Sequence, residues 1–160
     1  MIILGIDPGL VQTGFGLIKI INNNKNILDY GVITPKRDAS LSQRLKTIYE
    51  DISYIIEKHS PTIMAIEEVF YGKNVKSALL LGHARGVSMI AASKKNIPVF
   101  EYSPRKVKQS ITGNGTAHKS QVQFMIMKEF NIKNNKFSYD ASDALGIALC
   151  HFNQIKLKEL

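Results

Sequence analysis

The stretch Met1-Ile-Ile-Leu-Gly-Ile-Asp-Pro-Gly9 decides the fold. Its residues 2–6 form a short, apolar and mostly β-branched run, which is typical of a buried strand. Asp7 closes this run, and Pro8-Gly9 predicts a turn directly after it. The stretch therefore predicts a carboxylate at the end of a buried strand, although an ordinary exposed turn also commonly begins with Asp-Pro-Gly.

Three more acids stand where a predicted element ends or begins. Glu67 closes the apolar run 62–66, and Asp140 and Asp143 open a late predicted helix, on which they can share one face. Two carboxylates ~5 Å apart repel by roughly 3 kcal/mol at an effective dielectric near 20. If the two strands are neighbours and the helix crosses their ends, these acids and Asp7 predict a divalent-metal site, because oxygen ligands suit Mg²⁺ or Mn²⁺.

The residues alone leave two points open at this site. The side chains of Glu67 and Glu68 point to opposite faces of a strand, so at most one of them faces Asp7. Asp140 and Asp143 lie in a first helical turn, where the helix dipole favours acids even without a function.

The rest of the chain predicts strands and helices around this stretch. Two strands at 14–21 and 27–34, joined by a turn at 22–26, make the opening a three-stranded antiparallel meander. The later elements are expected in this order: a helix at 41–56 capped by Ser40 or Ser42, strands at 62–67 and 97–101 with a helix at 75–93 between them, a helix at 104–111 capped by Ser103, a helix at 119–130, and a helix at 139–157 capped by Ser138. This order predicts an α/β fold with a mixed five-stranded sheet, three strands antiparallel and two parallel, flanked by helices.

Length and composition limit the class of protein. The 160 residues suit one domain, expected to span 1–160. The single cysteine, Cys150, is expected to be a buried structural thiol, which fits a reducing cytoplasm. No apolar stretch approaches ~18 residues and no basic leader precedes the first strand, so we expect a cytoplasmic protein with no membrane partner.

The positive charge is concentrated in one part of the chain. The net charge is +8, and residues 69–128 hold ten Lys or Arg side chains against one acid, Glu101. This block follows Glu67 and precedes Asp140, so a basic band beside an acidic cluster predicts a polyanion held against metal ions. A set of solvated helix faces is the alternative explanation.

A short aromatic and basic segment follows Glu67. Phe70 and Tyr71 lie close to Lys73 and Lys76 in the sequence, and aromatic rings interleaved with lysines commonly stack on unpaired bases. The alternative is that Phe70 belongs to the core and Tyr71 is a half-buried surface ring. The histidine and cysteine spacing predicts no zinc site.

These features together resemble the RuvC family of Holliday junction resolvases. The matching stretches run in family order across nearly the whole chain, at 4–9, 13–16, 65–70, 77–86, 98–102, 107–109, 119–122 and 140–145. The resemblance implies a ribonuclease-H-like fold, which agrees with the element order above.

Carried over residue by residue, the resemblance implies a metal-dependent nuclease. Asp7, Glu67, Asp140 and Asp143 are then the ligands of two Mg²⁺ ions, with Mn²⁺ as a plausible substitute, and Glu67 rather than Glu68 faces the site. The implied reaction is two-metal hydrolysis of a phosphodiester.

The resemblance also implies contacts with DNA. Phe70 falls where the family has a residue that stacks on opened bases near the crossover. Lys108 and Lys119 fall on basic positions important for cleavage, and Arg85 and Arg105 are expected to contact the DNA backbone.

Family members act as homodimers that cut two like strands of a four-way junction in recombination and repair, together with a branch-migration complex of the RuvA and RuvB type. The apolar helix at 75–93 is the expected dimer surface, with burial in the core as the alternative. Glu68 departs from the family pattern, because an uncharged residue often follows the catalytic glutamate.

Three other functions fit parts of the sequence less well. A sugar-kinase or actin-like ATPase needs two such domains around its nucleotide, and 160 residues supply one. A junction-binding module without catalysis does not need all four acids. A nuclease acting on RNA–DNA hybrids does not need the aromatic and basic segment that begins at Phe70.

Overall fold

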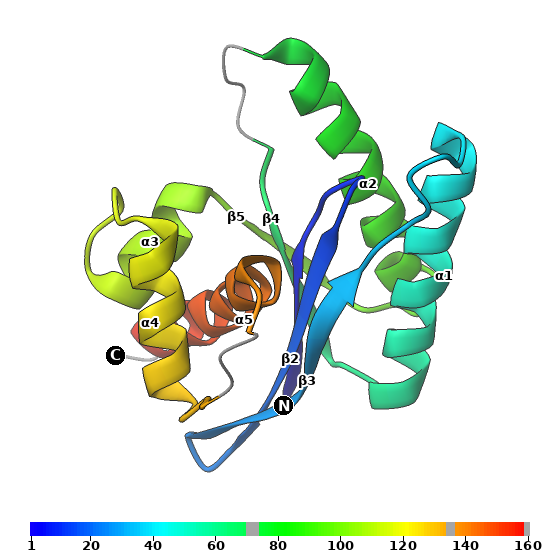
Figure 1. Cartoon of the computed structure of the whole chain (residues 1–160). Coiled ribbons are helices and arrows are strands. Elements are labelled where there is room, and N and C mark those ends of the chain that lie inside the picture. The colour runs from blue at the N-terminus through cyan, green and yellow to red at the C-terminus, as the bar shows by residue number, and fades with distance from the viewer. Residues whose placement is uncertain (70–73, 134–136, 159–160) are drawn as a thin grey trace.

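The computed structural model describes residues 1–69, 74–133 and 137–158. Five strands form one mixed sheet with helices on both of its faces (Figure 1). The strands are β1 (Ile2–Asp7), β2 (Thr13–Ile21), β3 (Asn24–Ile33), β4 (Ile63–Glu67) and β5 (Val99–Tyr102), in the spatial order β3-β2-β1-β4-β5. β1 to β3 pair antiparallel, while β4 and β5 continue the sheet parallel to β1, so the predicted mixed sheet is confirmed.

The helices divide between the two faces of the sheet (Figure 1). They are α1 (Leu41–His59), α2 (Val75–Ser93), α3 (Pro104–Thr112), α4 (Lys119–Glu129) and α5 (Tyr139–Lys158). In β1, Leu4 packs in the core shared with α1 and α2, and Ile3 packs in the core shared with α3, α4 and α5. Because both faces are covered, β1 is apolar at successive positions rather than at alternate ones.

Two glycines let α5 lie directly on the sheet. A side chain at Gly5 would place its Cβ 2.0 Å from the backbone oxygen of Ala144, and one at Gly14 would place it 2.1 Å from the backbone oxygen of Asp140. No other residue type fits at this distance. The close contact holds the first turns of α5 against β1 and β2, near the end of β1 that carries Asp7.

The predicted hairpin turn is present, but it is shorter than the expected range 22–26. Ile21 already pairs with Asn24, so the hairpin loop has only two residues, Asn22 and Asn23. Their φ angles are 47° and 66°. Asparagine tolerates this left-handed region, and a two-residue loop of this kind matches the twist of antiparallel strands better than a longer polar turn.

The predicted helix caps can be judged one by one. Ser40 caps α1, because its Oγ accepts a hydrogen bond from the Gln43 amide and the Gln43 side chain accepts one from the Ser40 amide. Ser103 caps α3, and the Oγ of Ser138 accepts a hydrogen bond of 3.2 Å from the amide of Ala141. In the part of the chain that the structure describes, no helix is long and apolar enough to cross a membrane.

Candidate active site

Asp7 and Glu67 end two neighbouring parallel strands. Ile6 of β1 pairs with Ile66 of β4, so the next residues, Asp7 and Glu67, stand side by side about one strand spacing, ~4.8 Å, apart. Gly5 faces α5, and period-two alternation therefore directs Asp7 to the same face. Glu67 is half-buried beside Asp7, whereas Glu68 is exposed.

α5 brings the other two acids to the same edge of the sheet. Asp140 lies in its first turn, over Gly14, and Asp143 follows three residues later with a side chain that is 17% exposed. Both carboxylates act electrostatically on Asp7. Residues 7, 67, 140 and 143 therefore lie at one edge of the sheet, within electrostatic range of one another, although they come from three different elements.

Burial and mutual repulsion disfavour the ionised form of the acids in this cluster. Burial, together with the carboxylates of Glu67 and Asp143, raises the pKa of Asp7 to about 8. Burial and the charge of Asp143 raise the pKa of Glu67 to about 7. Burial also raises the pKa of Asp143, in spite of a nearby lysine. Carboxyl groups with raised pKa values bind a cation strongly, because the cation removes the repulsion between them.

That lysine is Lys119, the first residue of α4. Its Nζ donates a hydrogen bond of 3.1 Å to Oδ2 of Asp143. Burial opposes the charge on Lys119, but the carboxylate of Asp143 outweighs it and raises the lysine pKa. Lys108 of α3 also lowers the pKa values of Glu67 and Asp143, so it too belongs to the electrostatic surroundings of the acids.

The residues of this cluster suit a hard divalent cation. All four side chains offer oxygen donors, and the nearest positive charges come from lysines, which cannot ligate a cation while protonated. Among residues 1–69, 74–133 and 137–158, no three His, Cys, Asp or Glu side chains already surround one point as metal ligands. Asp143 is engaged by Lys119 in this arrangement.

The loop that follows Asp7 is held at both ends, which the sequence did not indicate. The fully buried Thr13 donates a hydrogen bond of 2.7 Å from Oγ1 to the Gly9 oxygen and accepts one of 3.3 Å from the Gly9 amide. From α1, Nη2 of Arg44 donates a hydrogen bond of 2.6 Å to the oxygen of Leu10. No periodicity or motif could reveal a contact between positions 34 residues apart.

The chain is similar to known proteins over almost its whole length. Residues 3–151 match the family model for the crossover junction endodeoxyribonuclease RuvC. The chain belongs to the RuvC family. The RuvC protein of Alkaliphilus oremlandii is 47% identical over 151 residues, which cover 94% of this chain and 92% of that protein. The RuvC protein of Ruminiclostridium cellulolyticum is 43% identical over 160 residues, which cover 100% of this chain and 96% of that protein.

The fold is also that of RuvC. The structure of Thermus thermophilus RuvC in complex with a Holliday junction substrate superposes with a TM-score of 0.90 at 28% identity, and the match covers 99% of this chain and 96% of that one. The yeast mitochondrial Holliday junction resolvase Ydc2 shares the fold at a TM-score of 0.71, with 17% identity, 98% of this chain and 82% of that chain covered.

The residues expected to contact DNA in this RuvC chain lie in several places. Lys108 and Lys119 lie beside the acids, as described. Arg105 is exposed at the start of α3, and its side chain lies against Gly115. Arg85 of α2 forms an ion pair with Glu101 of β5, so one of its roles is to join these two elements.

Four expected contacts lie at the gap between β4 and α2. Lys76 is exposed in the first turn of α2, which begins after this gap. Phe70, Tyr71 and Lys73 lie outside the residues that the structure describes.

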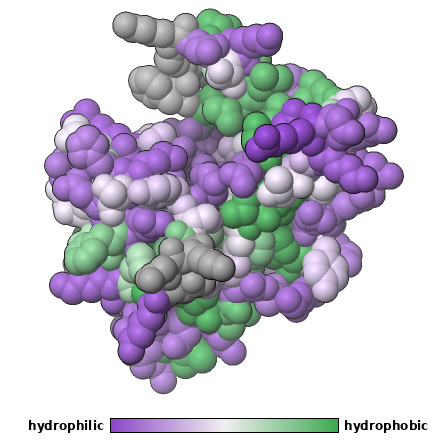
Figure 2. All heavy atoms as spheres, viewed as in Figure 1, coloured by the Kyte–Doolittle hydropathy of each residue, from purple (hydrophilic) through white to green (hydrophobic). Residues whose placement is uncertain are grey.

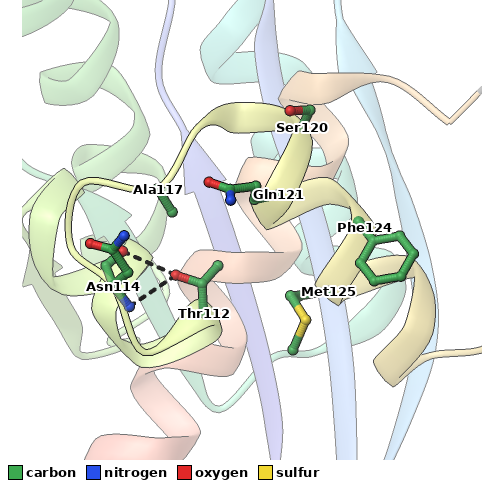
Figure 3. A pocket seen from close by; sticks show the side chains of 7 residues that line it. All are labelled: Thr112, Asn114, Ala117, Ser120, Gln121, Phe124 and Met125. Atoms are coloured by element: carbon green, nitrogen blue, oxygen red, sulfur yellow. Dashed lines mark hydrogen bonds between the residues drawn. The ribbon is translucent and has the colours of Figure 1, made fainter.

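A hollow of about 340 Å³ lies beside α4, between that helix and the loop after α3 (Figure 3). Thr112 and Asn114 close the loop, because Oγ1 of Thr112 donates to the Asn114 oxygen at 3.0 Å and accepts from the Asn114 amide at 3.1 Å. Phe124 and Met125 line its apolar side. None of the four acids lines this hollow, so it is separate from the acidic cluster.

Proposed function

We propose that this chain is a crossover junction endodeoxyribonuclease that hydrolyses phosphodiester bonds in four-way DNA junctions. Asp7, Glu67, Asp140 and Asp143 are its metal ligands. The single observation that carries the proposal is the meeting of these acids, from three separate elements, at one edge of the sheet. Membership of the RuvC family supports the same substrate.

The proposed cofactor is Mg²⁺, two ions per site, with Mn²⁺ as a substitute. The bound ions would supply activation of the attacking water and stabilisation of the leaving oxygen. The protein's own contribution is the rigid placement of Asp7 and Glu67 on adjacent strands and of Asp140 and Asp143 on α5. Fixed carboxylates of this kind need no rearrangement when charge develops on the phosphate.

Lys119 has a distinct role in this proposal. It is the cation nearest to Asp143, with its side chain 65% exposed, so it can move between the carboxylate and an arriving phosphate. In that position it stabilises negative charge on the phosphate oxygens. Lys108 supports the same charge from α3 at longer range.

The proposed enzyme is a homodimer that pairs through α2. One stripe of this helix is exposed or open to solvent over its whole length and holds Val75, Leu79, Gly82, Gly86 and Ile90. A Cβ at Gly82 or Gly86 would meet nothing within 4 Å, so a second helix can approach closely there. Figure 2 shows hydrophobic surface over the upper part of α2. A symmetric pair of sites matches the near two-fold symmetry of a crossover junction.

A branch-migration complex of the RuvA and RuvB type is the proposed partner in the cell, because it acts on the same junction. A cytoplasmic location follows from that DNA substrate.

The test is cleavage of a mobile synthetic four-way junction, with a linear duplex as the control substrate. We expect symmetric nicks in the junction with Mg²⁺ and none with a chelator. Asp7→Asn should abolish cleavage and still bind the junction, because the substitution removes a metal ligand and preserves the side-chain volume. Cleavage by Asp7→Asn at the wild-type rate would refute the assignment of the metal site.

A further inference from the structure

The segment between β3 and α1 leaves the sheet at the same level as Asp7. Asp7 pairs with Gly14 of β2, and Gly14 pairs with Val32 of β3. With strands ~4.8 Å apart, Val32 lies about 10 Å from Asp7 along this edge. Residues 34–40 follow directly and connect to α1 at Leu41, so they pass from this edge of the sheet toward the face that α1 covers, opposite the face on which α5 lies (Figure 1).

This segment presents two cations to solvent. Lys36 and Arg37 are both exposed, and neither forms an ion pair with any residue that the structure describes. Asp38 is the only acid among residues 34–44, which carry a net charge of +2. A polar hollow of about 560 Å³ adjoins Lys36. Figure 2, in the orientation of Figure 1, shows mainly hydrophilic surface in this region.

The opposite side of the acidic cluster is also basic. Tyr102 of β5 pairs with Glu67, and α3 begins two residues later, so Arg105 and Lys108 follow on the outer side of β4. The sheet order therefore places the strands that carry Asp7 and Glu67 in the middle, with basic side chains outside them on both sides. The positively charged block at 69–128 supplies only one of these sides.

We propose that Lys36 and Arg37 bind the sugar-phosphate backbone of a junction arm, as a second phosphate-binding side of the active site. The inference rests on the proposed function, since it takes the same DNA as substrate. The two strands that border a groove of duplex DNA are separated by about 6 Å across the minor groove and 12 Å across the major groove. A backbone held at Asp7 therefore has its neighbour across a groove near the end of β3, about 10 Å away, where the segment with the long side chains of Lys36 and Arg37 begins.

The proposed phosphate contacts come from the side chains of Lys36 and Arg37, and not from the backbone amides at the start of α1. Ser40 and Gln43 already satisfy amides of the first turn through the capping box. Arg44 is likewise engaged, because it donates to the oxygen of Leu10. Lys36 and Arg37 remain as the free cations of the segment that the structure describes.

The experiment measures junction binding against salt in an Asp7→Asn background, so that no cleavage interferes. Binding of a fluorescent four-way junction is followed by anisotropy from 50 to 300 mM salt. For the added double substitution Lys36→Gln/Arg37→Gln, we expect weaker binding and a slope of log affinity against log salt that is shallower by about 0.9 for each lost phosphate contact, or about 1.8 in all.

The matched control is Lys19→Gln/Lys133→Gln, which removes the same charge elsewhere. Lys19 pairs with Ile2, at the opposite end of β1 from Asp7. Lys133 follows the last turn of α4, far from its first residue, Lys119. We expect the control to keep the slope of its background. Equal slopes for the two double variants would overturn the inference alone, whereas no preference of the background for junction over linear duplex would overturn the proposed function with it.

Discussion

Among the acids of the site, Asp7 has a strongly raised pKa. Its ordinary pKa is 3.8, and burial together with Glu67 and Asp143 raises it to about 8. An acid with a raised pKa destabilises the folded state wherever the unfolded chain would ionise it. The site therefore lowers the stability of the metal-free protein, as expected of residues placed for chemistry rather than for folding.

The loss of folding stability caused by Asp7 can be tested by measuring stability at several pH values. Between pH 4 and pH 8 the carboxyl of Asp7 is ionised in the unfolded chain and protonated in the folded one, so folding takes up a proton and stability falls as pH rises. The slope from this one group reaches at most about 1.4 kcal/mol per pH unit. In chelator, Asp7→Asn should therefore gain stability over wild type as pH rises from 5 to 8, measured by urea unfolding. If the free energy of unfolding changed with pH in the same way in both proteins, Asp7 would not have a raised pKa in the folded state.

Binding of a divalent metal should offset the destabilisation that the acidic cluster causes. A ligand present at about 100 times its Kd stabilises the folded state by about 2.7 kcal/mol. At pH 8 we therefore expect Mg²⁺ or Mn²⁺ to raise the melting temperature of wild type, and to raise that of Asp7→Asn much less. Equal shifts in the two proteins would place the metal elsewhere.

Lys119 gives a third prediction at this scale. Lys119→Gln removes the cation that faces Asp143 and should lower single-turnover cleavage of saturating junction by about 10²–10³-fold, the effect of losing one stabilising donor. Lys119→Arg keeps the charge and should recover part of the rate. Loss of junction binding with an unchanged rate at saturation would assign Lys119 to binding instead.

At the scale of elements, the contact of α5 with β1 and β2 sets the site. Gly14→Ala would place a methyl group 2.1 Å from the backbone oxygen of Asp140, so α5 must shift outward. Such overpacking costs about 1–3 kcal/mol in stability, and we expect a larger loss in cleavage, because Asp140 and Asp143 move with the helix. Urea unfolding and nicking assays measure the two effects.

Gly146→Ala is the matched control on the same helix. Its added Cβ would lie 3.7 Å from Val107, which is ordinary contact. Replacing a glycine inside a helix with alanine raises the folding stability by about 0.5–1 kcal/mol. We therefore expect unchanged or higher stability and normal cleavage. Equal damage from the two substitutions would mean that the close contact at Gly14 has no special part in the site.

Local sequence signals predicted most elements but not their contacts. The helix over 75–93 has the bounds that its apolar pattern and flanking residues indicate, because those signals act within the segment. The turn at 22–26 is shorter in the structure, because the polar run does not reveal which asparagines take left-handed angles. Strand ends predicted where Asp7 and Glu67 stand, and the family resemblance assigned them together. The Arg44 hydrogen bond to Leu10 and the role of Gly14 depend on packing between distant segments, which no local pattern encodes.

For the whole molecule, the exposed stripe on α2 is the proposed dimer interface. Leu79 is 63% exposed on the proposed stripe, and Leu157 is 64% exposed near the end of α5. Leu79→Glu should therefore convert the dimer to a monomer in sedimentation velocity, whereas Leu157→Glu, a change of equal chemistry and exposure, should leave it dimeric. A monomer should also lose the paired timing of its two nicks. Dimers of both variants would exclude α2 as the interface.

The hydrogen bond from Arg44 to Leu10 restrains the loop that follows Asp7, on one side of the acidic cluster. Opening the loop after Asp7 means breaking that bond and the two between Thr13 and Gly9, while Lys119 on the other side swings in open solvent. Ions and water should accordingly enter and leave past α4. The amide hydrogen of Gly9, which donates to Oγ1 of Thr13, should exchange slowly for a residue outside any helix or strand. A hydrated ion should pass the ammonium group of Lys119, which lies on the exposed side of the acidic cluster.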